Sequence, residues 1–296
     1  MALRSTVSRG WVLALLLPTL ALSPPASATE TLHAEVDFNA PPSGCVVPGA
    51  FDSHTAGATL GVSCGDNTSV GAATARVDHG QVGAASSATD VTQGVATFAY
   101  ASWQDDSFVI TGAPGQTGTT PVSLNFILEG GFGGFGAPTS NTVVIVHVGI
   151  FGASFDAFIQ HMDTGDSCQN GPGSPVDFCG PFNHSESLGT VFTTPVMNLP
   201  INTPFEVDYV LQVDSDALGR GASTDGDFAH TLGFATGGPV LNFTEPGFTV
   251  NAGSYIIDNA YVAAVDEPAA SMLLAVGLGG LVPWLHRRRP LSARAS

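Results

Sequence analysis

The sequence contains no lysine, and its eight positive charges are all arginine. Charged residues make up 11% of the 296 positions, where an ordinary soluble domain has roughly 25%. A chain so poor in bases cannot neutralise phosphates, which excludes DNA- and RNA-binding proteins. The scarcity of charge, with 36 glycines and 20 prolines, also excludes coiled coils and helix bundles. Apolar residues still make up 44%, enough to fill a core, so the composition does not predict disorder.

Helical periodicity is also missing between Thr29 and Asp266. Short runs rich in Val, Phe, Thr, Ile and Tyr recur there, separated by Gly, Pro, Asn or Asp. Such runs predict strands, and without crossover helices the strands must pair antiparallel. We therefore expect an all-β chain with a single antiparallel β-sandwich, jelly-roll-like, over residues 29–264. The expected strands are 95–103, 107–111, 122–128, 143–148, 205–213, 228–234, 241–243 and 254–262, with a flexible turn at 130–136. Alternation in the first of these places Phe98 and Tyr100 on one face.

The N-terminus has the three parts of a secretory signal peptide over residues 1–28. Arg4 and Arg9 are basic, residues 11–22 are apolar, and Ala26 and Ala28 give the small-x-small cleavage pattern. Twelve apolar residues span about 18 Å as a helix, which is short for a membrane core of about 30 Å. We expect cleavage after Ala28 and an exported protein.

The C-terminus predicts a single transmembrane helix. Residues 269–285 carry no charge, and Arg287, Arg288 and Arg289 follow them. A basic cluster at the end of a span stays cytoplasmic, which places the preceding domain outside the inner membrane.

The motif Asp266-Glu267-Pro268, followed by this apolar segment and the arginine cluster, resembles the PEP-CTERM sorting signal of Gram-negative bacteria. The match covers residues 265–290, with Asp266 in place of the first proline and a short tail at 291–296. The resemblance implies processing by exosortase, a membrane enzyme, and delivery from the inner membrane to the cell surface or the exopolysaccharide matrix. Strand-like motifs at 101–111, 202–205, 227–232 and 246–250 are similar to those of other proteins with this signal, which generally have no assigned activity.

Cys45, Cys64, Cys168 and Cys179 all lie in the exported region. An oxidising compartment and an even count predict two disulfides, for which three connectivities are possible. Loop closure favours the local pairs Cys45–Cys64 and Cys168–Cys179, each closing a loop worth about 3 kcal/mol. No C-x-x-C pair is present, so a cysteine metal site is not expected.

All 25 acidic residues lie between Glu30 and Glu267, where Arg76 and Arg220 are the only bases. Such a polyanion repels nucleic acids and anionic lipids or polysaccharides. The densest acidic cluster contains Asp214, Asp216, Asp225 and Asp227. Its carboxylate oxygens make it a candidate Ca²⁺ site, and the alternative is an acidic turn exposed to solvent.

Catalytic motifs are weak. Residues 61–65 match G-x-S-x-G, and Gly131, Gly133 and Gly136 match G-x-G-x-x-G, but neither has the helix that its chemistry requires. His161, His184 and His230 lie near carboxylates in the sequence, as chance allows in a domain of this size. We therefore predict no catalytic site and no enzyme.

The resulting hypothesis is a surface-sorted structural or adhesive protein of the envelope or matrix. The alternative is a carbohydrate-binding module or a polysaccharide-acting enzyme on the same scaffold. Exposed aromatic side chains in a row would favour binding, and two facing carboxylates in a cleft would favour an enzyme. We expect any ligand at loop tips near 165–181 or 214–227.

Overall fold

The computed structural model describes residues 30–40, 51–65, 69–90, 94–133, 140–162, 165–182, 187–218 and 221–262. Almost all regular structure in these ranges is β-strand, which confirms the all-β prediction. The predicted signal peptide, the sorting signal with its transmembrane helix, and Cys45 lie outside the described residues. Within the described ranges, no helix is long and apolar enough to span a membrane.

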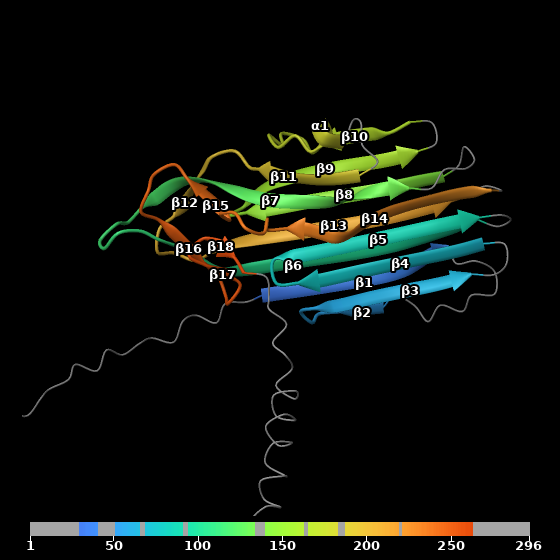
Figure 1. The fold of residues 1–296 in the computed structure, drawn as a ribbon, viewed down its shortest axis with the longest axis horizontal. Helices are drawn as coiled ribbons and strands as arrows, with labels where there is room; N and C mark the ends of the chain where they lie inside the picture. The colour runs from blue at the N-terminus through green and yellow to red at the C-terminus, as the bar shows by residue number, and fades with distance from the viewer. Residues whose placement is uncertain are drawn as a thin grey trace, which may run out of the picture.

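Two antiparallel sheets of eight strands pack face to face (Figure 1). Sheet A has the spatial order β10-β9-β8-β13-β6-β1-β2, with β16 also paired to β6. Sheet B has the order β11-β7-β14-β5-β4-β3, with β12 and β15 also paired to β7. This arrangement confirms a sandwich-like fold, and the jelly-roll topology stays a prediction.

Several strands are longer than the sequence pattern predicts. Sheet A is built from β1 (Glu30–Ala40), β2 (Phe51–Ser53), β6 (Val95–Thr111), β8 (Ser140–Ile150), β9 (Ala153–Met162), β10 (Ser167–Asn170), β13 (Phe205–Ala217) and β16 (Thr249–Asn251). Sheet B is built from β3 (Ala58–Gly65), β4 (Ser69–Asp78), β5 (Gln81–Asp90), β7 (Thr119–Gly133), β11 (Ser187–Thr193), β12 (Met197–Pro200), β14 (Ala222–Gly233) and β15 (Leu241–Phe243). A small hairpin, β17 (Ile256–Ile257) and β18 (Ala260–Tyr261), and one helical turn, α1 (Cys179–Phe182), complete the fold.

Three expected boundaries are wrong. The expected strand 254–262 is a short hairpin, β17 and β18, because Asp258 and Asn259 turn the chain with positive φ angles. The expected strands 95–103 and 107–111 form one strand, β6, because a bulge opposite Phe205 and Val207 absorbs the polar residues between them. The start of the glycine-rich segment, expected as a turn, continues β7 to Gly133, where it pairs with β11 and β14. Backbone pairing on both sides outweighs the flexibility of glycine there.

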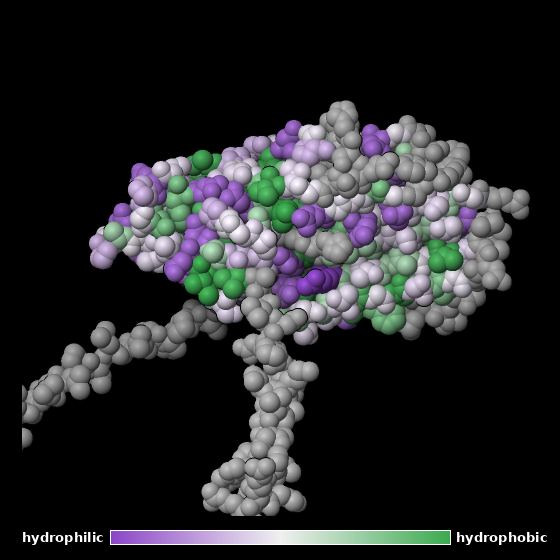
Figure 2. Space-filling model, in the orientation of Figure 1, coloured by the Kyte–Doolittle hydropathy of each residue, from purple (hydrophilic) through white to green (hydrophobic). Residues whose placement is uncertain are grey.

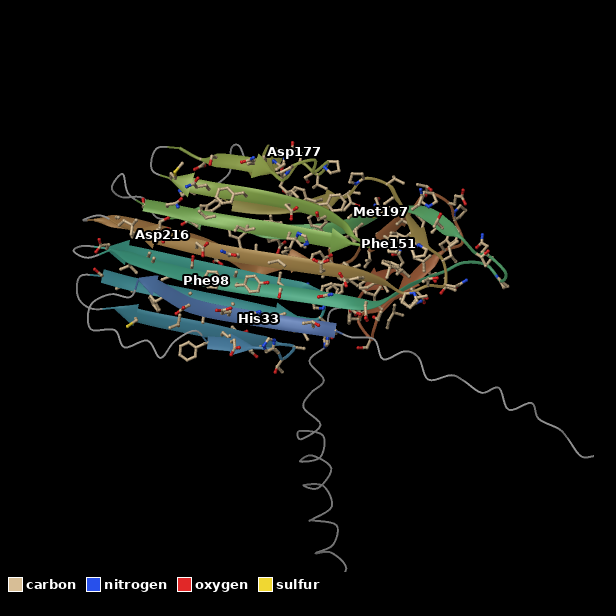
Figure 3. The ribbon with its side chains drawn as sticks, turned by 180° about the vertical axis from the view of Figure 1, so that it is seen from behind. His33, Phe98, Phe151, Asp177, Met197 and Asp216 are labelled. Carbon is tan, nitrogen blue, oxygen red and sulfur yellow. A yellow bond between two sulfur atoms is a disulfide. The ribbon has the colours of Figure 1, made fainter. Side chains whose placement is uncertain are left out.

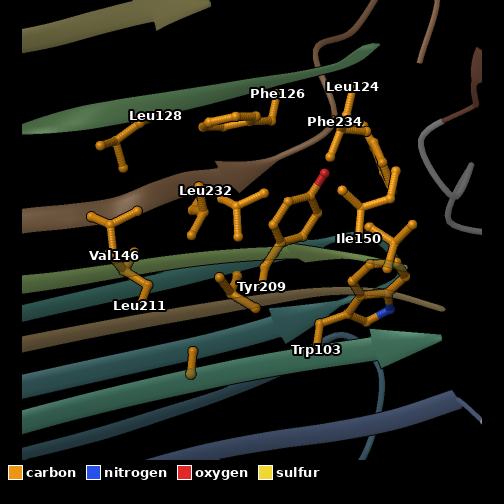
Figure 4. Packing of buried hydrophobic residues seen from close by; sticks show 14 of the residues in the cluster. Trp103, Leu124, Phe126, Leu128, Val146, Ile150, Tyr209, Leu211, Leu232 and Phe234 are labelled. Atoms are coloured by element: carbon orange, nitrogen blue, oxygen red, sulfur yellow. The ribbon is translucent and has the colours of Figure 1, made fainter. Parts of the chain in front are cut away.

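Alternation of buried and exposed residues places one face of each sheet in the core. Figure 4 shows side chains of both sheets meeting there, with Trp103, Tyr209 and Phe234 at one end and Leu128, Val146 and Leu211 farther along. Trp103 is 1% exposed. The same alternation turns a second set of side chains outward on each sheet, and these outer faces carry the candidate sites.

Candidate functional site

The predicted acidic cluster is divided between two faces. Asp214 and Asp216 lie on β13 and point away from the core of sheet A, whereas Asp225 and Asp227 lie on β14 of sheet B. The four carboxylates were expected in one cluster, but β13 belongs to sheet A and β14 to sheet B. The structure therefore does not bring them together as one Ca²⁺ site.

Asp225 and Asp227 border a hollow of about 220 Å³ on the outer face of sheet B. Its other lining residues are small: Ala72, Ala73, Thr74, Ala85, Ser86, Ser87 and Gly226. Figure 2 shows this side of the molecule, where pale residues of intermediate hydropathy cover much of the surface over β3–β5. Burial raises the pKa of Asp225, and the neighbouring Asp227 raises it further. Both carboxylates come from one strand, and Asp227 also accepts a hydrogen bond from the backbone N–H of Ala229, 3.1 Å away.

Aromatic side chains form a continuous row on the outer face of sheet A. Phe98 and Tyr100, expected on one face of a strand, lie two residues apart on β6 with ring centroids 6.4 Å apart and nearly parallel planes. His33 on β1 lies 5.4 Å from Tyr100, and His54 stacks on His33 at 4.8 Å. Figure 3 looks onto this face and shows Phe98 between His33 and Asp216. We call Phe98, Tyr100 and His33 the aromatic row.

Polar side chains border the aromatic row on both sides. Tyr100 is flanked by Glu35 on β1 and Gln212 on β13 in the strand register. Phe98 is flanked in the same way by Asp37 and Asp214. The outer face of sheet A therefore combines half-buried aromatic rings with amide and carboxylate groups.

Asp214 is destabilised in its charged form. Burial raises the pKa of Asp214, and its Oδ1 atom is buried without a hydrogen-bond partner, while Oδ2 accepts from Gln212 Nε2 at 2.8 Å. Because burial raises the pKa of Asp214 in the folded chain, ionisation of this carboxyl lowers the free energy of unfolding. This loss of stability is present at pH 7 and disappears once Asp214 is protonated.

Replacing Asp214 with asparagine should therefore raise the free energy of unfolding at pH 7 by about 0.5–1.5 kcal/mol. The amide removes the charge and keeps an oxygen for Gln212. Urea unfolding at pH 7 and pH 3 measures the effect, which should disappear at pH 3. Glu245→Gln, at an exposed position, is the control and should change nothing. A destabilised Asp214→Asn variant at pH 7 would contradict this interpretation.

His147 on β8 lies on the same outer face as the aromatic row, with β13 between them, and was not identified from the sequence. Its Nδ1 is 2.5 Å from Asp156 on β9, and its Nε2 is 2.9 Å from Asp208 on β13. Hydrogen bonds to Asp208 and Asp156 raise the pKa of His147 to about 9 against the opposing effect of burial. Gly149 makes room for this arrangement, because a Cβ at that position would lie 1.9 Å from Asp208 Oδ1. His147 thus joins three strands as a cation.

The weaker sequence motifs acquire no catalytic geometry. Ser63 of the G-x-S-x-G match points outward on β3, a strand that pairs with β4 and is not followed by the helix of a nucleophile elbow among the described residues. His161 Nδ1 contacts Asp166 Oδ1 at 2.5 Å. His184, Gly136 and the side chain of His230 lie outside what the structure describes.

One predicted disulfide is confirmed. Cys168 on β10 is bonded to Cys179 on α1, and Cys64 is also disulfide-bonded. The Cys168–Cys179 bond fixes the segment 165–181, where Phe178 packs in the core against Phe126 and Phe192. This segment, expected as a ligand-binding loop, is therefore tied to the sandwich by its own side chains.

Comparison of the chain with protein-family models, with curated proteins and with solved structures finds no match. The functional assignment below therefore depends on the residues of this chain and on the arrangement of its outer faces.

Proposed function

We propose that this protein is an exported, non-enzymatic adhesive protein of the bacterial envelope or exopolysaccharide matrix. In this proposal it binds polysaccharide through the outer face of sheet A. The observation that carries the proposal is the aromatic row of Phe98, Tyr100 and His33, bordered by Gln212 and carboxylates. Sugar rings present apolar C–H faces that pack on aromatic rings, while their hydroxyls donate to amide and carboxylate oxygens.

The charge of the domain limits which polysaccharide fits. Asp37, Asp214, Glu35 and Asp208 all project from the same outer face as the row. The cationic His147 on this face is already paired with Asp208 and Asp156, and the one arginine in the described ranges, Arg76, pairs with Asp78 on β4 of sheet B. An anionic polymer would be repelled by this face, so the proposed ligand class is a neutral polysaccharide.

Affinity electrophoresis tests this proposal with the full chain purified in detergent. Neutral hydroxyethylcellulose, glucomannan and galactomannan should be compared with anionic alginate. At least one neutral polymer is expected to retard migration, and Tyr100→Ala and Phe98→Ala should each weaken that effect about tenfold, the equivalent of one aromatic stacking contact. Phe151→Ala is the matched control, because Phe151 is 53% exposed at a hairpin tip away from the row. Retardation that is equal in all four proteins, or absent with every neutral polymer, would refute the proposal.

A second candidate function is a polysaccharide-acting enzyme, favoured by Asp225 and Asp227 in the hollow on sheet B. An acid with a pKa raised by burial beside a second carboxylate is a feature of glycoside hydrolysis. Release of reducing ends from the same polymers, lost in Asp225→Asn and kept in Phe98→Ala, would favour this candidate.

The proposed route to the surface depends on the two termini. Signal-peptide cleavage after Ala28 and exosortase processing near Asp266 would release the domain from its inner-membrane anchor. The intact mass of the protein in the surface fraction of its host tests this route. A chain from Thr29 to about Asp266 is expected, and a chain still carrying Ala269–Ser296 would contradict sorting and indicate a plain membrane anchor.

A further inference from the structure

Four metal-ligating side chains form a square at the edge of sheet A, where β1 pairs with β2. His33 and Glu35 alternate along β1, and Asp52 lies opposite Glu35 in the strand register. His54 follows β2 and stacks on His33. The pattern is thus H-x-E on β1 and D-x-H at the end of β2, with His33, Glu35 and Asp52 on the outer face and His54 stacked on His33.

The ligand atoms of this square are close together. One ligand atom each from His33, Asp52 and His54 can be chosen within 4.8 Å of the others. His54 Nε2 lies 3.9 Å from Asp52 Oδ2, and His33 Nε2 lies 3.7 Å from Glu35 Oε2. Ligands of a tetrahedral zinc ion with bonds of about 2.1 Å are roughly 3.4 Å apart. The His54 and Asp52 side chains are 65% and 66% exposed, so rotation can supply the remaining movement.

The tautomer of His54 favours coordination through Nε2. Its Nδ1 lies 2.9 Å from the backbone carbonyl oxygen of Leu32, which can only accept a hydrogen bond. Nδ1 therefore donates this hydrogen bond, which leaves Nε2, the ring nitrogen that faces Asp52, as the position for a metal ion. Metal-ligating histidines usually have such a partner on the second ring nitrogen.

A positive charge between the two carboxylates would stabilise the pairing of β1 with β2. Glu35 and Asp52 are directly opposite each other on adjacent strands, where like charges destabilise a sheet. Arg76, the single arginine within the described ranges, pairs instead with Asp78. A bound cation would relieve this repulsion and hold the three-residue strand β2 against β1.

We infer that His33, Asp52 and His54, with Glu35 as a fourth group, form a surface site for Zn²⁺. Imidazole nitrogens with carboxylate oxygens suit zinc and related transition metals, whereas Ca²⁺ selects oxygen ligands alone. His33 belongs to both the aromatic row and this site, but the inference does not rest on polysaccharide binding, and its test changes only His54 and Asp52, which lie outside the row.

Isothermal titration of the full chain with ZnCl₂ at pH 7.5 tests the site. About one equivalent of Zn²⁺ is expected to bind, and His54→Ala and Asp52→Asn should each weaken it at least about tenfold. Zinc should also raise the melting temperature of the wild type and not of these variants.

Two controls make the result specific. Glu245→Gln removes an exposed carboxylate elsewhere and should bind zinc as the wild type does. The metal-free melting temperatures of His54→Ala and Asp52→Asn should equal that of the wild type, since both side chains are mostly solvent-exposed. Equal zinc affinity in all variants, or equal competition by CaCl₂, would mean diffuse binding to an acidic surface and would overturn the inference.

Discussion

Replacing Trp103 with alanine is expected to lower the free energy of unfolding by about 3–5 kcal/mol. The indole is 1% exposed and contacts four other aromatic rings. It stacks on Tyr209 with centroids 5.4 Å apart, and it meets Phe234, Tyr255 and Phe108 edge-on at 5.6, 6.0 and 6.2 Å. Removing it leaves a large cavity between the sheets that neighbouring strands cannot fill.

The indole also has a polar role. Its Nε1–H donates to Glu30 Oε1 at 2.7 Å, and the same carboxylate contacts His79 Nδ1 at 2.7 Å. The hydrogen bond between Trp103 and Glu30 links the start of β1 to the core. Trp103→Phe should therefore cost less than alanine but still about 1–3 kcal/mol, because Glu30 loses its donor.

Urea unfolding followed by circular dichroism measures both Trp103 variants. Phe151→Ala is the control for an exposed aromatic residue and should stay within about 0.5 kcal/mol of the wild type. A loss below about 1 kcal/mol in Trp103→Ala would show that this end of the core is not packed as described.

The second large effect is a loss of stability in alkali caused by His147. In the folded chain the pKa of this imidazole is raised to about 9, compared with about 6.5 when unfolded. A raised histidine pKa stabilises the folded state fully below pH 6.5, and the contribution disappears as the pH rises through 9. The side chain is 30% exposed, so screening by solvent reduces the contribution to about 1–3 kcal/mol.

Comparison of the wild type with His147→Gln isolates this contribution. The difference in free energy of unfolding should be largest near pH 6 and should vanish near pH 10. Gly149→Ala is a second variant, because its Cβ displaces the Asp208 carboxylate and should lower the pKa of His147 in an NMR titration. A pH-independent difference between wild type and His147→Gln would mean that the imidazole has no ionic role.

The sequence predicted the β-class and several strand cores because period-two alternation is a local property. Phe98 and Tyr100 were placed on one face correctly, and the Cys168–Cys179 pair followed from loop closure. Alternation cannot tell to which sheet a strand belongs. For this reason Asp214 and Asp225 were expected in one cluster, although β13 and β14 lie in different sheets.

The His147 bridge and the His33–His54 square could not be found by local reasoning. His147 meets Asp208 only because β8 and β13, far apart in the sequence, are neighbours in sheet A. The square did leave a signal, since H-x-E and D-x-H both have the spacing of side chains on one face of a strand. The missing information was that β1 and β2 are paired.

Hydroxyl-radical footprinting with the neutral polysaccharide that retards the chain most strongly tests the central claim most directly. Oxidation of Phe98, Tyr100 and His33 should fall on binding, while Phe51 and Phe151, which are 41% and 53% exposed, should react as before. Protection confined to these row residues is the predicted result. Unchanged oxidation of Phe98 and Tyr100 at saturating polysaccharide would contradict the outer face of sheet A as the binding surface.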